Sequence, residues 1–151
     1  MSTLKVALLD VNVLVALFDP AHVHHEIAHD WFADHREQGW ATCPLTENGF
    51  LRTASSVAQA GEFVTVTALA DGLRKFRSSG YHEFWPHDLS LLDERVFNMA
   101  FARGHQQLTD VYLLGVAVKR NGRLVTFDRK IQLAAVKGAT RASLEVLAPA
   151  E

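Results

Sequence analysis

The chain has 151 residues, of which 48% are hydrophobic and 21% charged, with a formal net charge of −2 at neutral pH. This composition is typical of a globular protein and excludes a disordered chain, and the length suits one domain spanning residues 1–151. The small negative charge excludes binding to nucleic acid through overall basicity and leaves a local basic face open.

The cysteine content and the start of the chain indicate where the protein resides. Cys43 is the only cysteine, which excludes a disulfide framework and a cysteine-rich zinc site and suits a reducing cytoplasm. The apolar run Leu4–Phe18 is interrupted by Lys5, Asp10 and Asn12 and lacks a small-residue cleavage site. We therefore expect a cytoplasmic protein with neither a signal peptide nor a membrane span.

The first half of the chain alternates short apolar runs with amphipathic stretches. Lys5–Leu9 is aliphatic without polar alternation, which is typical of a strand buried on both faces. Gly39 ends a helical pattern, and Pro44 stands where a new helix begins. After the first strand we expect, in chain order, helices at Val13–Phe18 and His24–Glu37, a strand at Trp40–Cys43, a helix from Pro44, a helix at Val66–Arg77 and a strand at Tyr81–Trp85.

The second half continues this alternation. We expect, in chain order, a helix at Leu91–Ala102, a central helix at Asp110–Lys119, a turn at Asn121-Gly122, a strand at Arg123–Phe127, a last short helix and a strand at Leu144–Leu147. Alternating strands and helices pack as a sheet that is covered by helices on both faces, with right-handed crossovers. The expected fold class is α/β, a three-layer α/β/α arrangement with a central, mainly parallel sheet.

Four acidic residues fall where ligands bind in such a sheet, just beyond the carboxyl ends of the strands. Asp10 and Asp128 directly follow two expected strands. Glu47 lies in the first helical turn after another strand, and Asp110 opens the apolar helix. Each acid alone has a structural explanation, because Asp caps helices and acids favour the first helical turn. All four together predict an acidic cluster at one edge of the sheet.

Such a cluster predicts metal chemistry. Carboxylates that crowd together repel one another and need a compensating cation. Oxygen ligands without cysteine or histidine suit Mg²⁺ or Mn²⁺. The predicted chemistry is phosphoryl transfer or phosphodiester hydrolysis, in which a metal ion activates a water and neutralises the phosphate.

The charge distribution supports a polyanionic substrate. Residues 103–141 contain 8 Lys or Arg and 2 Asp or Glu, a net of +6, whereas residues 1–102 contain 7 basic and 13 acidic residues, a net of −6. The two acids of the basic stretch are Asp110 and Asp128. Arg129 and Lys130 follow Asp128 directly and are the best placed to meet phosphates. The structural alternative is a solvated surface, because charge along the chain does not fix charge in space.

Four motifs in order carry a resemblance to a known family. The first is a hydrophobic run followed by Asp and Asn-x-Leu, and the four motifs span Leu8–Leu17, Thr46–Arg52, Leu108–Leu114 and Val125–Asp128. The sequence resembles the PIN-domain ribonucleases, and within them the VapC toxins of bacterial type II toxin–antitoxin pairs. The resemblance covers nearly the whole chain.

The resemblance implies a metal-dependent endoribonuclease that works as a homodimer and is inhibited by an antitoxin protein inserting a peptide near its active site. It carries over Asp10, Glu47, Asp110 and Asp128 as the catalytic acids, with Asp10 and Asp110 as direct Mg²⁺ ligands. Glu47 and Asp128 would coordinate a second metal ion or orient the attacking water. Asn12 and Thr126 match supporting polar positions, and Arg129 and Lys130 are the expected RNA-binding residues.

Three other functions fit parts of the sequence. His25-Glu26-x-x-His29 matches a zinc-peptidase helix, with His35 as a third ligand, but the helix continues through Phe32 where that fold turns back. His35 would lie about 15 Å along the helix from His25, too far to share an ion. Asp10-Val-Asn12 only partly matches aspartyl-phosphate phosphatases. A catalytically silent module that binds RNA or protein is the remaining alternative, against which the complete set of four acids argues.

Overall fold

A computed structural model describes residues 5–58, 64–102 and 104–148. Its sheet has five strands, all parallel, in the order β3-β2-β1-β4-β5. The strands are β1 (Ala7–Leu9), β2 (Trp40–Thr42), β3 (His82–Phe84), β4 (Arg123–Thr126) and β5 (Leu144–Val146). The α-helices are α1 (Val11–Phe18), α2 (His25–His35), α3 (Pro44–Ala58), α4 (Val66–Arg77) and α5 (Leu108–Lys119). The expected three-layer α/β/α fold is confirmed.

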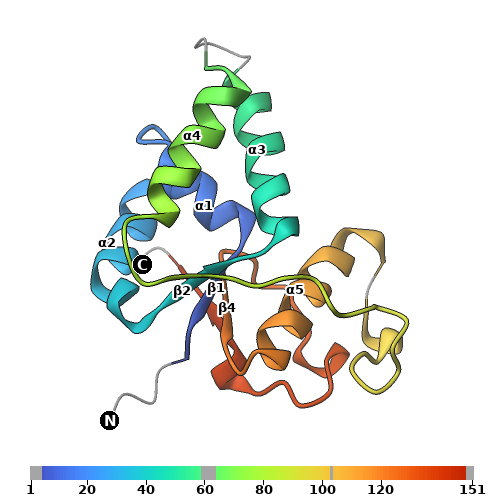
Figure 1. Cartoon of the computed structure of the whole chain (residues 1–151). Coiled ribbons are helices and arrows are strands. Elements are labelled where there is room, and N and C mark those ends of the chain that lie inside the picture. Colours follow the sequence, from blue (N-terminus) through green and yellow to red (C-terminus); the bar gives the residue numbers. More distant parts are fainter. Residues whose placement is uncertain (1–4, 59–63, 103, 149–151) are drawn as a thin grey trace.

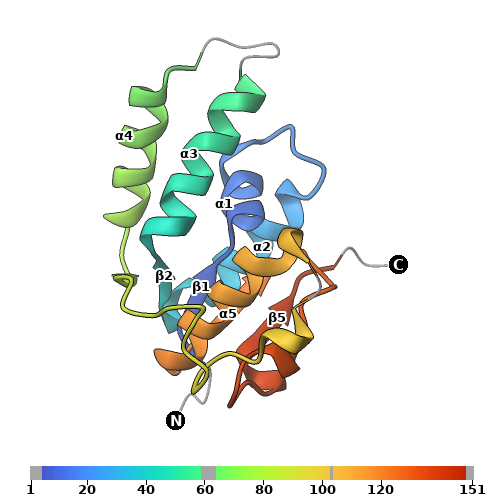
Figure 2. The same cartoon turned by 90° about the vertical axis from the view of Figure 1, so that its right-hand side faces the viewer.

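The sheet separates two hydrophobic cores, because side chains alternate between its faces along each strand. Ala7 and Leu9 of β1 face a core that they share with α1, α2, α3 and α4. Leu8 between them faces a second core, which contains α5 and the segments around Trp85 and Val136. Figures 1 and 2 show α3 and α4 running side by side away from the sheet. β1 is fully buried, as its aliphatic sequence predicts.

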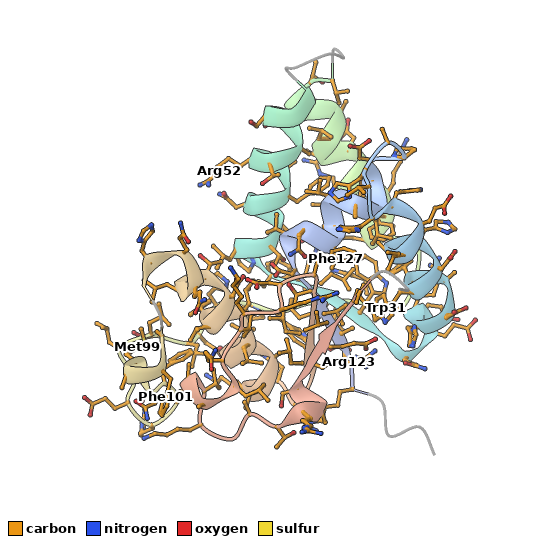
Figure 3. The ribbon with its side chains drawn as sticks, turned by 180° about the vertical axis from the view of Figure 1, so that it is seen from behind. Trp31, Arg52, Met99, Phe101, Arg123 and Phe127 are labelled. Carbon is orange, nitrogen blue, oxygen red and sulfur yellow. The ribbon has the colours of Figure 1, made fainter. Side chains whose placement is uncertain are left out.

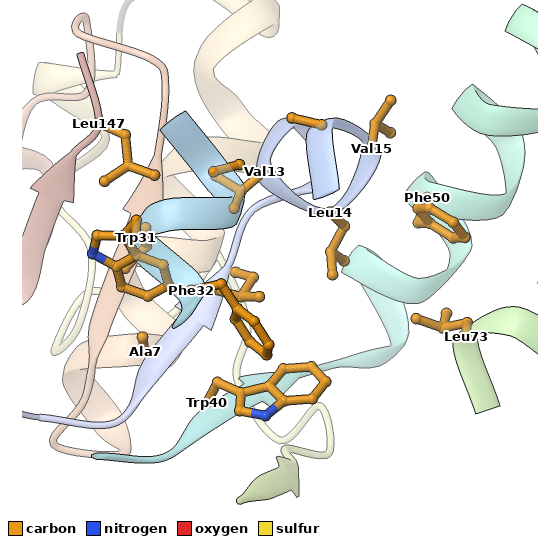
Figure 4. Packing of buried hydrophobic residues seen from close by; sticks show 14 residues of the cluster. Ala7, Val13, Leu14, Val15, Trp31, Phe32, Trp40, Phe50, Leu73 and Leu147 are labelled. Carbon is orange, nitrogen blue, oxygen red and sulfur yellow. The ribbon is translucent and has the colours of Figure 1, made fainter. Parts of the chain in front are cut away.

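Aromatic side chains fill the first core (Figure 4). Phe32 of α2 packs edge to face on Trp40 of β2 with ring centroids 5.3 Å apart. Phe76 of α4 lies 4.5 Å from Trp40 and 4.9 Å from Phe32. Phe18 of α1 contacts both Phe76 and Phe50 of α3. These contacts fix α4 against β2, and the position of α4 becomes important at the functional site.

The helix expected at Leu91–Ala102 is wrong. The structure has turns there, and only Met99–Phe101 forms a short 3₁₀ helix. The backbone amides of Leu92 and Arg95 bond to the side chains of Ser90 and Asp93, which compete with helical hydrogen bonds. Further along, Phe97 pairs as a single antiparallel bridge with Val136. The backbone of this segment therefore forms hydrogen bonds with nearby side chains and pairs with the segment around Val136, instead of forming helical bonds.

The remaining differences are small. The expected last short helix is divided into two 3₁₀ helices, Leu133–Ala135 and Arg141–Ser143, and other helix and strand bounds shift by a few residues. Two further 3₁₀ helices, Arg36–Gln38 and His105–Gln107, stand at the end of α2 and before α5. None of the helices in the described part of the chain has both the length and the apolar character needed to span a membrane.

Candidate active site

Asp10 is fixed at the point where β1 passes into α1. It is only 4% exposed, and it caps α1 by accepting a 2.7 Å hydrogen bond from the Val11 amide through Oδ1. Its Oδ2 accepts a 2.7 Å bond from the Thr126 hydroxyl at the end of β4. Asp10 therefore caps α1 with one carboxylate oxygen, while its second oxygen binds the neighbouring strand.

Thr126 links the ends of β1 and β4. Besides donating to Asp10, its Oγ1 accepts bonds from the Asp128 amide at 3.0 Å and from Asn12 Nδ2 at 3.4 Å. Asn12 Oδ1 in turn accepts from the Phe127 amide at 3.3 Å. Thr126 and Asn12, the predicted supporting residues, thus hold the backbone that presents Asp128.

Asp110 lies in the first turn of α5 and completes the group of aspartates. Burial, a hydrogen bond with the Asp128 carboxyl and the charges of Asp10 and Asp128 together raise the pKa of Asp110 to about 8. The hydrogen bond from Asp110 and the amide of Lys130 lower the pKa of Asp128. Burial also raises the pKa of Asp10, with a contribution from the Asp128 charge. Near neutral pH, Asp110 and Asp128 share one proton.

The aspartate cluster (Asp10, Asp110 and Asp128) has the chemistry of a divalent-cation site. Its ligand atoms are all carboxylate oxygens, and their mutual repulsion contributes to the raised pKa of Asp110. Among the described residues, no three acid, histidine or cysteine side chains converge closely enough to enclose an ion in this conformation. The donor set fits Mg²⁺ or Mn²⁺, and binding would displace the shared proton.

Glu47 is held differently from the aspartates. It lies in the first turn of α3, after β2, and its Oε2 accepts a 2.7 Å hydrogen bond from the buried Thr42 hydroxyl. The same oxygen lies 3.1 Å from Nη1 of Arg77, the last residue of α4. Glu47 is not among the charges that shift the pKa values of the three aspartates. The structure thus brings three of the four predicted acids together and pairs the fourth with a cation.

Sequence reasoning missed Arg77, Thr42 and His82, which build this second arrangement. The Thr42 hydroxyl has a single proton, which it gives to Glu47, so His82 Nε2 must donate to Thr42 Oγ1 at 2.7 Å. Burial, together with the charge of Arg77, lowers the pKa of His82 to about 4, so the ring is neutral. The only local signal was the position of Thr42 at a strand end, because Arg77 reaches Glu47 through tertiary packing alone.

The basic stretch does not form one surface. Arg123 is 5% exposed and bonds to Glu145 at 3.0 Å, with its guanidinium 5.8 Å from the Trp31 ring (Figure 3). Lys119 and Arg120, at the end of α5 far from Asp110, both pair with Asp88. The charge excess along residues 103–141 is therefore partly offset in the structure, because these three basic side chains are paired with acids.

Two of the basic residues do flank the aspartates. Arg129 and Lys130 are exposed, and the Lys130 amide donates to Asp128 Oδ1 at 2.8 Å. Their side chains extend from the loop that carries Asp128, so they remain the candidates for contact with phosphates.

The histidine motif on α2 has a structural role. α2 is continuous from His25 to His35, as expected from its sequence. His25 Nδ1 bonds to the Ala16 carbonyl at 2.7 Å, and His29 is exposed. His35 stacks on Trp31 with ring centroids 4.9 Å apart. His25 thus links α2 to α1, and His35 packs on a residue of its own helix.

A family model for the PIN domain matches residues 7–137, which include all four predicted acids. The chain belongs to the PIN-domain family. It is 45% identical over 141 residues to Ribonuclease VapC44 of Mycobacterium tuberculosis (strain ATCC 25618 / H37Rv), covering 93% of this chain and 99% of that protein. Over 132 residues it is 39% identical to Ribonuclease VapC39 of the same strain, covering 87% and 95%. Ribonuclease VapC38 of that strain is 42% identical over 122 residues, covering 81% and 84%.

The resemblance deduced from the four motifs is thus confirmed. In this PIN domain, the acids of the four motifs lie directly after β1, shortly after β4 and in the first turns of α3 and α5. The family model ends before β5, which pairs in parallel with β4 and contributes Glu145 to the contacts of Arg123.

Proposed function

We propose that this protein is the toxin of a toxin–antitoxin pair and acts as a Mg²⁺-dependent endoribonuclease. The observation that carries the proposal is the aspartate cluster at the carboxyl edge of the sheet, where Thr126 joins Asp10 to the backbone of Asp128 and Asp110 opens α5. The VapC relatives are named ribonucleases, and their similarity covers nearly the whole length of this chain. Hydrolysis adds water at phosphorus and breaks the bond to the leaving oxygen.

Each acid has a proposed role. Asp10 and Asp110 hold Mg²⁺, or Mn²⁺ in its place, and Asp128 and Glu47 complete the catalytic set. A divalent cation there would activate water and neutralise the phosphate that RNA presents. Asp10 needs fixed geometry for this, and Thr126, itself supported by Asn12, keeps its carboxylate in one orientation.

Arg129 and Lys130 are the proposed contacts to the RNA backbone. Both are exposed and directly follow Asp128 in the chain, which places two positive charges beside the aspartate cluster. Such contacts contribute affinity without sequence specificity.

The assembly and setting follow the same proposal. The partners are an RNA substrate, a cognate antitoxin protein and a second copy of the chain in a homodimer, and the protein works in the cytoplasm without a membrane. Residues 1–151 form one PIN domain, which β5 completes by extending the sheet beyond the segment that the family model matches.

The test is cleavage of a mixed pool of structured RNA by the purified protein and by Asp10→Asn. The assay is run with Mg²⁺, with Zn²⁺ and with a chelator. We expect cutting that needs Mg²⁺ and falls by at least about 100-fold in the variant, because a ligand of the metal is lost. Equal behaviour of the two proteins, or cutting that survives the chelator, would show that the acids are structural caps. RNA binding without cleavage would identify a silent module.

A further inference from the structure

Glu47 already has a cation beside it. Arg77 Nη1 lies 3.1 Å from Glu47 Oε2, and the two side chains are 36% and 20% exposed. This partial burial distinguishes the pair from exposed ion pairs, which water and salt weaken. Arg74, one helical turn earlier on α4, has a different partner and pairs with the exposed Asp71.

The guanidinium of Arg77 is held in place from two further sides. It lies 5.1 Å from the centroid of the Phe84 ring, at the end of β3. The helix that carries it is anchored through Phe76, which packs against the buried Trp40. Arg77 is therefore a fixed charge at this part of the edge.

Glu47 is fixed by the same set of neighbours. Oε2 receives the Thr42 hydroxyl as well as Arg77, and His82 holds Thr42 from the adjacent strand. Among the described residues, Oε1 of Glu47 has no hydrogen-bonding partner in the protein. One carboxylate oxygen is thus saturated, and the other is open.

A second divalent cation at Glu47 would have to bind beside this guanidinium. Like charges at such short separation repel, and the partial burial of the two side chains limits how far water screens them. At the aspartate cluster, by contrast, no arginine or lysine of the described residues lies within ion-pair distance of Asp10, Asp110 or Asp128.

We propose that Arg77 is a built-in counter-ion for Glu47 and limits the site to one divalent cation, bound at the aspartate cluster. This inference rests on the proposed function. In it, Arg77 is a positioning residue, and the open Oε1 of Glu47 orients the water or the substrate without binding a second ion.

The test is the number of Mn²⁺ ions bound per chain, measured by electron paramagnetic resonance of free Mn²⁺ and by calorimetry. We expect one ion for the wild type. Arg77→Gln should bind a second ion, or bind the first about tenfold more tightly, because a nearby positive charge is removed. Arg74→Gln is the matched control, since it makes the same charge change on the same helix, and it should leave one ion with unchanged affinity.

Two ions in the wild type, or wild-type or weaker binding in Arg77→Gln, would overturn the inference. Glu47→Gln tests it independently of how Arg77→Gln folds. We expect that variant to keep one ion with affinity weakened by no more than about threefold, since Glu47 is not a ligand of that ion under this inference. A loss of binding as large as that in Asp10→Asn would make Glu47 a ligand and contradict the inference. Wild-type Mn²⁺ binding in Asp10→Asn would instead refute the proposed function.

Discussion

The two parts of the acidic edge differ in how their charge is compensated. At the ends of β1 and β4 and the start of α5, Asp10, Asp110 and Asp128 lie close enough to shift pKa values within the group, and Asp110 and Asp128 are hydrogen-bonded to each other. At the end of β2, Glu47 is paired with Arg77 from α4. All four acids follow strands or open helices, so their secondary structure does not distinguish them. The residues that face these acids in the tertiary structure make the difference. The aspartates face one another and favour a cation, whereas the charge of Glu47 is already neutralised by Arg77.

This difference predicts that the aspartate cluster lowers the stability of the metal-free protein, whereas the Glu47–Arg77 pair does not. The aspartate cluster places repelling carboxylates in a partly buried site, which costs stability and leaves a strong preference for a bound cation. The Glu47–Arg77 pair is compensated within the protein and has no such cost. Three experiments would break or sharpen the comparison.

The largest effect is expected from Asp110→Asn. Catalysis should fall by at least about 100-fold, because a proposed metal ligand is lost. The metal-free protein should nevertheless become more stable near neutral pH, by on the order of 1–2 kcal/mol after allowance for solvent screening. Urea unfolding in a chelator, beside cleavage with Mg²⁺, measures both.

The sign of this effect depends on pH. In the folded protein the pKa of Asp110 is about 8, against an ordinary value of 3.8. Between these values the unfolded chain has lost a proton that the folded chain keeps, so wild-type stability falls as pH rises from about 4 to 8. Asp10, whose pKa is also raised, adds to this fall, whereas the lowered pKa of Asp128 acts below its ordinary range. Parallel stability curves for wild type and Asp110→Asn would refute the shared proton.

A smaller effect is expected from removing one hydroxyl on each side. Thr126→Val removes the hydrogen-bonding partner of one group each on Asp10, Asp128 and Asn12. This change should lower the free energy of unfolding by about 1.5–3 kcal/mol. Thr42→Val leaves His82 without its acceptor but leaves Glu47 still paired with Arg77, and should cost only about 0.5–1.5 kcal/mol. Both threonines are fully buried, which makes the two variants a matched pair. Equal losses in urea unfolding would mean that the two sides do not differ.

The smallest effect is expected for RNA binding by the double variant Arg129→Gln, Lys130→Gln. Loss of two phosphate contacts should reduce the slope of log affinity against log salt by about 1.4 for single-stranded RNA. The double variant Lys119→Gln, Arg120→Gln removes the same charge at Asp88 and should leave the slope unchanged. Filter binding with Asp10→Asn as the parent protein avoids cleavage. An unchanged slope in the first variant would exclude these residues from the RNA contact.

Much of the fold follows from local pattern. The aliphatic run of β1, the capping Asp10 and the apolar α5 are read correctly, because burial and capping act over a few residues. The region Leu91–Ala102 is predicted wrongly. Its apolar residues occur at helical spacing, but the side chains of Ser90 and Asp93 accept hydrogen bonds from its backbone amides. Side-chain competition of this kind is decided by the turn that the surrounding structure imposes.

The sequence by itself determined the α/β alternation, the strand-end positions of all four acids and the membership of the PIN family. Only the tertiary structure decided that the carboxyl groups of Asp10, Asp110 and Asp128 lie close enough to interact with one another. It likewise decided that Glu47 is paired with Arg77. The reason is strand order: β2 lies between β1 and β3, so α4 and β3 bring their residues to Glu47 across a long stretch of chain. No local pattern encodes such a contact, since it depends on which elements become neighbours.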